Sequence, residues 1–153
     1  MSVFQYKTEQ LLNASLSEVW DFISSPDNLK LITPEYMGFN IQSKQEKEKM
    51  YEGQIIIYKV SPLLKIPMTW VTEITHVKEM EYFVDEQIIG PYKIWHHEHF
   101  IEETKNGVLM KDILTYSPPF GIIGKIANSL IIKNKIDQIF NFREKKLIEI
   151  FNT

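Results

Sequence analysis

The sequence predicts an α+β fold, in which a curved antiparallel sheet of about seven strands wraps around one long C-terminal helix. Two observations carry this prediction. Between residues 36 and 116, six consecutive segments alternate apolar and polar residues, and short turn-forming stretches separate them. Residues 122–151 instead carry an apolar stripe with helical spacing. Short connections join antiparallel neighbours, and the helix is available to cover one face of the resulting sheet.

Two short helices are expected between the first strand and the meander. Ser15 and Glu18 have the spacing of a capping box, which predicts a helix over residues 16–23. A second short helix is expected over residues 27–32, because Pro34 stops whatever precedes it. The seven strands are expected at residues 3–12, 36–44, 54–61, 68–77, 81–89, 92–102 and 108–116.

The long helix is expected to be continuous, with a kink near Lys133 and Asn134, where its apolar stripe is interrupted. A helix gripped by a curved sheet leaves a cavity between the two, and the stripe should face that cavity. The stripe consists of Ile126, Leu130, Ile136, Ile139, Phe140, Leu147 and Phe151.

Composition narrows the class of protein. With 153 residues, 44% of them apolar and 24% charged, the chain suits one soluble domain over residues 1–153. A net charge of −3 argues against nucleic acid as a partner, and the lack of cysteine excludes disulfides and thiolate chemistry. We find neither a signal-peptide pattern nor an apolar run of about 20 residues, so a cytoplasmic protein without stable membrane insertion is expected. The oligomeric state stays open.

Residues 90–116 form the most informative segment, because they predict a hairpin rich in polar and aromatic groups. A two-residue loop at residues 106–107 would place His97 opposite Tyr116 and make Asp112 a diagonal neighbour of His99. A tight turn at Gly90 and Pro91 would place Val84 beside His97 and turn Asp85 to the opposite face. The face expected to point inward carries Tyr82, Val84, Glu86, Trp95, His97, His99, Ile101, Met110, Asp112, Leu114 and Tyr116.

The two inward histidines allow a metal site, acid–base chemistry or plain cavity lining. A catalytic zinc site needs three protein ligands, and Asp112 would be the third only if the side chains converge. A carboxylate buried in an apolar strand needs a partner, and pairing Asp112 with His97 or His99 would favour the imidazolium form. We therefore assign neither a metal nor a cofactor. The chain also lacks a phosphate-binding loop, a nucleophile elbow and an HExxH motif.

The order of elements and a set of motif residues resemble the START-like (SRPBCC) superfamily, in particular its branch of small stand-alone bacterial ligand-binding proteins. The motif residues are Gly90, Pro91, Trp95, His97, His99, Asp112, Tyr116, Pro119 and Gly121. Phe100 departs from the pattern by standing one place early. The resemblance implies a helix-grip fold with a deep, mainly apolar cavity. Relatives bind lipids, sterols, plant hormones or polyketides, and some are aromatase/cyclases, so the fold is transferable and the reaction is not.

Three alternative functions are considered. Whether the protein is an enzyme stays open, and binding is preferred. The first is binding or carrying a small apolar ligand, with a wall of Ile57, Val84, Trp95, Met110, Leu114, Ile126 and Leu130 and a polar end of His97, His99, Asp112 and Tyr116. The alternative is a cyclase or hydratase, with His97 or His99 as the base and Asp112 as its orienting partner. A third reading is an interaction module that uses the outer faces of the helices.

Overall fold

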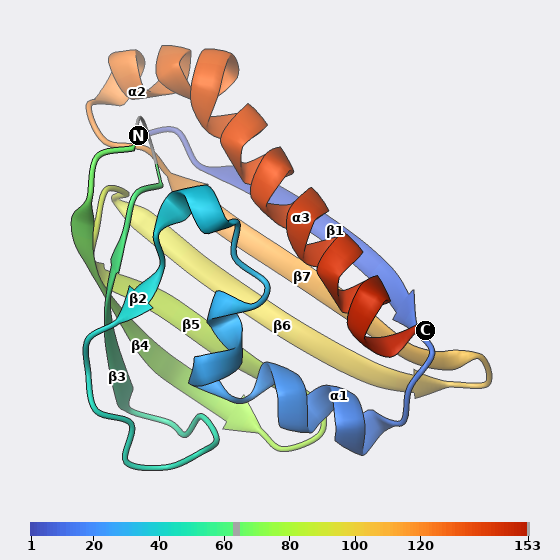
Figure 1. Ribbon diagram of the computed structural model, residues 1–153. Helices are drawn as coiled ribbons and strands as arrows, with labels where there is room; N and C mark the ends of the chain where they lie inside the picture. Colours follow the sequence, from blue (N-terminus) through green and yellow to red (C-terminus); the bar gives the residue numbers. More distant parts are fainter. Residues whose placement is uncertain (63–64, 153) are drawn as a thin grey trace.

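Seven strands form one antiparallel sheet (Figure 1), in a computed structural model that describes residues 1–62 and 65–152. The strand order across the sheet is β1-β7-β6-β5-β4-β3-β2, so every strand from β2 to β7 lies beside its neighbour in sequence. The strands are β1 (Phe4–Leu12), β2 (Asn40–Ile41), β3 (Gln54–Val60), β4 (Met68–Lys78), β5 (Tyr82–Ile89), β6 (Ile94–Thr104) and β7 (Gly107–Ser117). The predicted α+β helix-grip architecture is confirmed.

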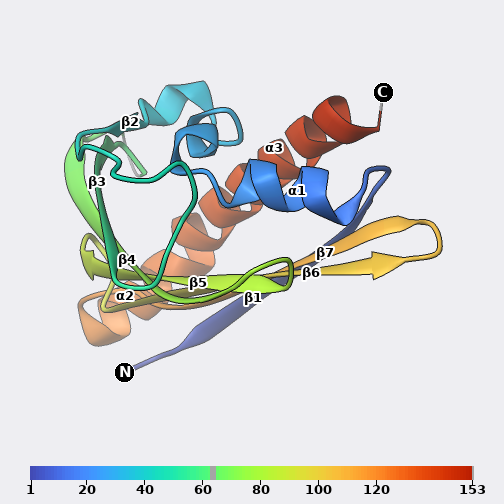
Figure 2. The ribbon, with the colours of Figure 1, turned by 90° about the horizontal axis from the view of Figure 1, so that it is seen from below.

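The helices α1 (Leu16–Ile23) and α3 (Lys133–Phe151) lie on the same side of the sheet (Figure 2). α1 begins with the predicted capping box, in which the backbone N–H of Ser15 donates to Glu18 at 2.8 Å. The second short helix is the 3-10 turn η1 (Pro26–Lys30). The strand expected at residues 36–44 is wrong over its first half, because the 3-10 turn η2 (Glu35–Met37) occupies it and only β2 remains.

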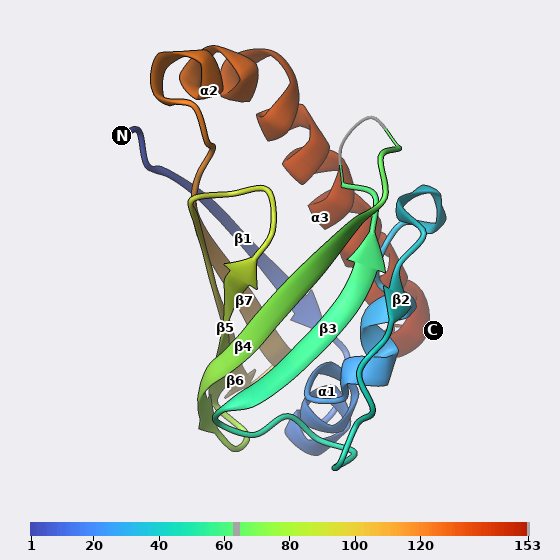
Figure 3. The same cartoon turned by 90° about the vertical axis from the view of Figure 1, so that its left-hand side faces the viewer.

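Two clusters of buried apolar side chains fill the space between the helices and the sheet. One lies under α1 and contains Trp20, Phe83 and Leu147. The other lies under the middle of α3 and contains Trp70 and Phe140. Figure 3 shows β3 and β4 crossing the front of the molecule with α3 behind them, so the curved sheet has the helix on its concave side. No helix in the described ranges, 1–62 and 65–152, is both long and apolar enough to span a membrane.

The β6–β7 hairpin differs from its predicted register by two residues. Thr104 pairs with Gly107, so the loop is residues 105–106. Gly107 is a strand residue with φ of +124°, and a side chain there would meet the backbone oxygen of Leu12 at 2.2 Å. Because side chains alternate between the two faces of a strand, a two-residue shift leaves each on its predicted face.

The β5–β6 connection is one residue out of its predicted register, and this error reverses a face. The tight turn at residues 90–91 is replaced by the longer connection 90–93. The side chain of Gln87 holds it, because Nε2 donates to the carbonyl of Tyr92 at 2.7 Å and Oε1 accepts from its N–H at 3.2 Å. Asp85 therefore pairs with His97 and shares its face, while Val84 pairs with Glu98 on the other face.

The C-terminal helix contains one π-helical turn, η3 (Asn128–Ile132), between α2 (Gly121–Ala127) and α3. Counting about 100° per residue from Ile136, an uninterrupted α-helix would turn Ile122 toward the buried stripe and Gly124 about 120° away from it. The structure shows the reverse, with Gly124 buried and Ile122 exposed. The extra residue of the π turn supplies this rotation. The predicted inward positions of Ile126 and Leu130 are wrong, because both side chains are exposed.

Candidate functional site

A cavity of about 150 Å³ lies between the sheet and the middle of α3. Its walls are mainly apolar and aromatic, and come from residues 29–39, the four strands β3 to β6 and α3. Both features are typical of small-molecule sites. The lining residues that the following paragraphs use are Tyr58, Pro62, Trp70, Asp85, Trp95, His97, His99, Lys135 and Arg143.

Two histidines and two aspartates form a polar cluster at one side of this cavity. His97 and His99 stand side by side on β6, with ring centres 3.7 Å apart. Asp112 on β7 lies behind them, with Oδ1 at 2.9 Å from both Nε2 of His97 and Nδ1 of His99. Asp85 on β5 lies on the other side, with Oδ2 at 2.7 Å from Nε2 of His99 and 3.7 Å from Nδ1 of His97. Each ring is therefore held between two carboxylates.

Arg143 of α3 completes the cluster from above the sheet. Its Nη1 lies 3.8 Å from Oδ1 of Asp112, and its Nη2 lies 3.3 Å from Nδ1 of His99. Only 11% of the Arg143 side chain is exposed. This contact ties the C-terminal helix to the centre of the sheet through charges rather than through apolar packing.

The two histidines differ in charge. Burial and the neighbouring charge of His99 lower the pKa of His97 to about 4, so His97 is neutral and its Nε2–H donates to Asp112. Burial alone would lower the pKa of His99, but its hydrogen bonds with Asp112 and Asp85 outweigh that effect and raise it. His97 therefore presents an unprotonated Nδ1, and His99 is the imidazolium of the pair.

Both aspartates are ionised. Burial would raise the pKa of Asp85, but the hydrogen bond from His99 and the nearby positive charges lower it. The same opposition acts on Asp112, where the Arg143 guanidinium and both imidazoles hold the pKa well below its usual range. Two carboxylates thus balance one imidazolium and one guanidinium, which is how a buried charged cluster avoids a large desolvation cost.

Asp85, His97 and His99 also form a candidate metal ligand set. Each offers one ligand atom, and the three atoms lie within 4.8 Å of one another. Two ligands at about 2.1 Å from a tetrahedral ion are separated by roughly 3.4 Å. Oδ2 of Asp85 and Nε2 of His99 are only 2.7 Å apart, the length of a charge-assisted hydrogen bond. The spacing fits a shared proton better than a shared ion, and the absence of a metal stays a prediction.

Two buried donors of the cavity walls lack a hydrogen-bond partner among residues 1–62 and 65–152. They are Nε1 of Trp70 and Nε of Arg143. Trp70 is 4% exposed and packs edge-on against Trp95, with ring centres 5.1 Å apart. Leaving a buried donor unpaired costs about 1–3 kcal/mol, so both groups would gain from an acceptor oxygen that came within reach.

The predicted polar residues meet the cavity in different ways. Trp95, His97 and His99 line it. Asp112 is buried behind the histidines and supports them from outside the cavity wall. Tyr116 does not join the polar end, because its hydroxyl donates to Oδ1 of Asn128 at 2.9 Å.

Most predicted apolar wall residues lie elsewhere. Met110 and Leu114 are buried in the core beside the cavity without lining it. Val84 is buried on the opposite face of the sheet, for the reason of register given above. Ile57 is 37% exposed because alternate residues of β3 face outward.

Sequence reasoning missed two residues of the site, Asp85 and Arg143, and assigned Trp70 to the core. Asp85 was placed on the outer face by the one-residue register error, and a four-residue loop at 90–93 would have corrected it. Arg143 was not among the predicted site residues. Its position seven residues after Ile136 is the signal that could have placed it on the buried stripe.

The comparisons with known proteins agree with this geometry at the level of fold. No family model matches the chain, and no curated protein sequence matches it. Among solved structures, the KanY protein (ms6282) superposes with a TM-score of 0.74 at 12% identity and covers 100% of both chains. Protein CV1439 from Chromobacterium violaceum gives a TM-score of 0.71 at 11% identity, over 97% of this chain and 98% of its own.

A third similar structure comes from a well-defined fold group. Ara h 8.0201, a protein of the Bet v 1 and START-like fold, gives a TM-score of 0.59 at 13% identity, over 97% of this chain and 99% of its own. At such low identity these likenesses show the fold and leave the reaction and ligand to the site itself. The chain has the START-like (SRPBCC) helix-grip fold.

Proposed function

We propose that the protein binds a small, mainly apolar molecule that carries at least one hydrogen-bond acceptor. The observation that carries this proposal is the pair of unpartnered donors, Nε1 of Trp70 and Nε of Arg143, on two residues that line a mainly apolar cavity. An acceptor oxygen on the ligand would satisfy one or both donors, while its apolar body would contact the aromatic walls.

The volume suits a ligand of one ring or its equivalent. A cavity of about 150 Å³ accommodates a molecule of about the size of benzene. The polar cluster is already neutral overall, so the ligand needs no full charge of its own. A ring with a carbonyl or ether substituent fits both the size and the donors.

A cyclase- or hydratase-type enzyme is the second candidate, favoured by one observation. His97 lines the cavity, is oriented by Asp112 and keeps an unprotonated Nδ1. This is the arrangement of a general base with its orienting carboxylate. A pKa of about 4, however, makes His97 a weak base at neutral pH, where a value near 7 works best. Binding is therefore preferred over catalysis.

The binding proposal is tested with a matched pair of probes, acetophenone and ethylbenzene. They have nearly the same shape and differ in the carbonyl oxygen. Followed by tryptophan fluorescence, acetophenone should bind, and ethylbenzene should bind about tenfold more weakly. Trp70→Phe should reduce this preference, while Trp20→Phe, in the core cluster under α1, should keep it. Equal binding of the two probes to the unmodified protein would contradict the proposal.

The enzyme candidate is tested on the same complex by following deuterium exchange at the methyl group of acetophenone in heavy water by NMR. Binding without proton transfer predicts exchange at the rate of the buffer. Exchange faster than the buffer rate that disappears in His97→Gln would instead support the enzyme.

A further inference from the structure

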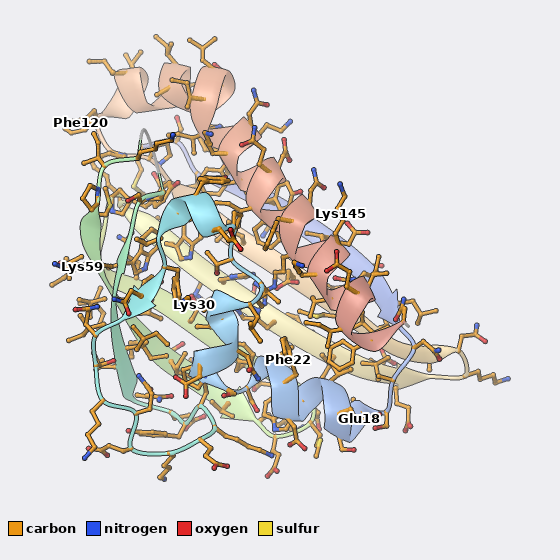
Figure 4. All side chains as sticks on the ribbon, in the orientation of Figure 1. Glu18, Phe22, Lys30, Lys59, Phe120 and Lys145 are labelled. Carbon is orange, nitrogen blue, oxygen red and sulfur yellow. The ribbon has the colours of Figure 1, made fainter. Side chains whose placement is uncertain are left out.

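Six large apolar side chains are exposed at the start of the C-terminal helix, and we refer to them as the apolar tip. Their exposed fractions are 76% for Phe120, 79% for Ile122, 72% for Ile123, 55% for Ile126, 66% for Leu130 and 45% for Ile131. Figure 1 shows α2 beyond the ends of the strands, and Figure 4 shows Phe120 at that corner of the molecule. A contiguous exposed apolar surface marks an interaction site rather than ordinary surface.

The apolar tip is held in this orientation by buried contacts. Gly124 packs so closely on the chain that a side chain there would meet the carbonyl oxygen of Pro119 at 1.9 Å. Asn128 is buried and accepts a hydrogen bond from Tyr116. These anchors lie on the side of the helix that faces the sheet. The opposite side is therefore presented to solvent by a fixed helix and not by a frayed end.

In the sequence, the apolar tip has only positively charged neighbours. Between Asp112 and Asp137 the sequence contains no acidic residue, whereas Lys125, Lys133 and Lys135 lie within this interval. The whole chain has a net charge of −3, so this end is a local exception. Apolar side chains flanked by lysines are the pattern of a helix that lies in the interface of an anionic bilayer.

We propose that the apolar tip docks on the surface of an anionic lipid bilayer. Ile122, Ile126 and Leu130 would enter the boundary between headgroups and acyl chains, and the lysines would contact lipid phosphates. A second copy of the chain fits less well, because a two-fold interface would bring the lysines of one copy against the same lysines of the other. The proposal rests on the surface of the helix and does not depend on the ligand of the cavity.

Docking in this orientation would also bring the opening of the cavity toward the bilayer. Lys135 lines the cavity together with Pro62, and both also border a more open hollow beside Tyr36, Ser61 and Lys65. Lys135 thus belongs both to the basic end and to the mouth of the cavity. An apolar molecule dissolved in the bilayer would have a short path to that mouth.

The test is co-sedimentation of the full chain with vesicles of phosphatidylglycerol and with vesicles of phosphatidylcholine. We expect binding to the anionic vesicles that weakens with added salt, and at least tenfold weaker binding to the neutral ones. Ile122→Asp should reduce binding at least tenfold, and Lys125→Glu roughly fivefold. Both side chains are exposed, so circular dichroism of the variants should be unchanged.

Matched controls separate the apolar tip from the rest of the surface. Ile148→Asp changes an exposed isoleucine at the other end of the same helix, and Lys145→Glu changes an exposed lysine there (Figure 4). Both should bind vesicles as the unmodified protein does. Trp70→Phe, which alters the cavity, should also bind unchanged, so failure of the ligand proposal would leave this result intact. Absence of vesicle binding, or a lipid-free dimer that Ile122→Asp converts to a monomer, would overturn the proposal.

Discussion

His99 lies directly opposite Asp112 in the β6–β7 pair, and Nδ1 of the ring is 2.9 Å from the carboxylate Oδ1. The same ring hydrogen-bonds Asp85 of the other neighbouring strand through Nε2. His99 therefore links three strands at the centre of the sheet. The charges of this cluster are matched in number, and each one depends on the others for its stability.

Replacing Asp112 by asparagine should strongly destabilise the fold. The substitution keeps the shape of the side chain but leaves the His99 imidazolium and Arg143 with only Asp85 as a counter-charge. We expect a loss of about 3 kcal/mol in the free energy of unfolding, measured by urea denaturation at pH 7. Glu9→Gln is the matched control, because Glu9 pairs with Lys111 on the exposed edge and should cost under about 1 kcal/mol. Equal effects of the two substitutions would contradict the role assigned to the cluster.

The stability of the protein should fall as the pH is lowered from about 6.5 to 4. The pKa of His97 is lowered to about 4 in the folded chain, below its ordinary value of 6.5. Between these values the unfolded chain binds a proton that the folded chain does not, so acid favours unfolding by up to roughly 3 kcal/mol. The pKa of His99 is raised, so its stabilising contribution is fully present below pH 6.5 and causes no loss of stability there. The pKa values of Asp85 and Asp112 are lowered, so these groups cause a loss of stability only below about pH 4.

The His97 contribution can be isolated by substitution. His97→Gln removes the titrating ring and keeps a donor for Asp112, so the free energy of unfolding should depend less on pH between 6.5 and 4. His76→Gln, on the exposed end of β4, should leave the pH profile of the unmodified protein in place. An unchanged slope in His97→Gln would show that another group causes the acid sensitivity.

Chelators should have no effect on the folded protein. The 2.7 Å separation of Asp85 and His99 is that of a hydrogen bond, so no ion is needed to hold these groups together. We expect the same Tm with and without an excess of EDTA, and no rise in Tm when Zn²⁺ or Mn²⁺ is added to protein previously treated with EDTA. A rise of several degrees that Asp85→Asn abolishes would instead establish a metal site.

Substituting alanine for Gly124 should displace the start of the C-terminal helix. The added methyl group would meet the carbonyl oxygen of Pro119 at 1.9 Å, and neither backbone can yield without moving α2. We expect a loss of about 2 kcal/mol by urea denaturation, since overpacking typically costs 1–3 kcal/mol. Gly38→Ala is the comparison. Gly38 has open space around it, so an alanine there would be strained only by the positive φ of 58°. A smaller loss at Gly124 than at Gly38 would contradict the close packing.

Whether an error in predicted strand register changed the site depended on the number of residues by which the register was shifted. The two-residue error in the β6–β7 register did no harm, because alternation kept His97, His99 and Asp112 on one face. The one-residue error between β5 and β6 exchanged Asp85 for Val84, because an odd shift reverses the face. Turn length decides between these outcomes, and the contacts of Gln87 that set it are tertiary.

The helical part of the prediction failed for a related reason. A π turn inside a helix has no reliable signature in sequence, and the residues 128–132 contain neither glycine nor proline to mark it. Counting 100° per residue therefore predicts the direction of the side chains correctly in α3 but not in α2, which lies beyond the π turn. Ile126 and Leu130 were assigned to the cavity because they belong to the apolar stripe of the helix, and they are exposed.

Because of the π turn at residues 128–132, one continuous helix directs its apolar side chains to the protein interior on one side of the turn and to the outside of the molecule on the other. On the C-terminal side of the turn, Ile136 and Phe140 point toward the protein interior. On its N-terminal side, the same hydrophobic periodicity points toward whatever surrounds the molecule. The turn holds one residue more than an α-helical path would need, so deleting a single residue here, such as Ser129, would restore α-helical hydrogen bonding and leave a separation of thirteen residues from Ile122 to Ile136. Thirteen residues at about 100° each still turn Ile122 away from Ile136, so this end of the protein would stay exposed in the shortened helix even without the π turn.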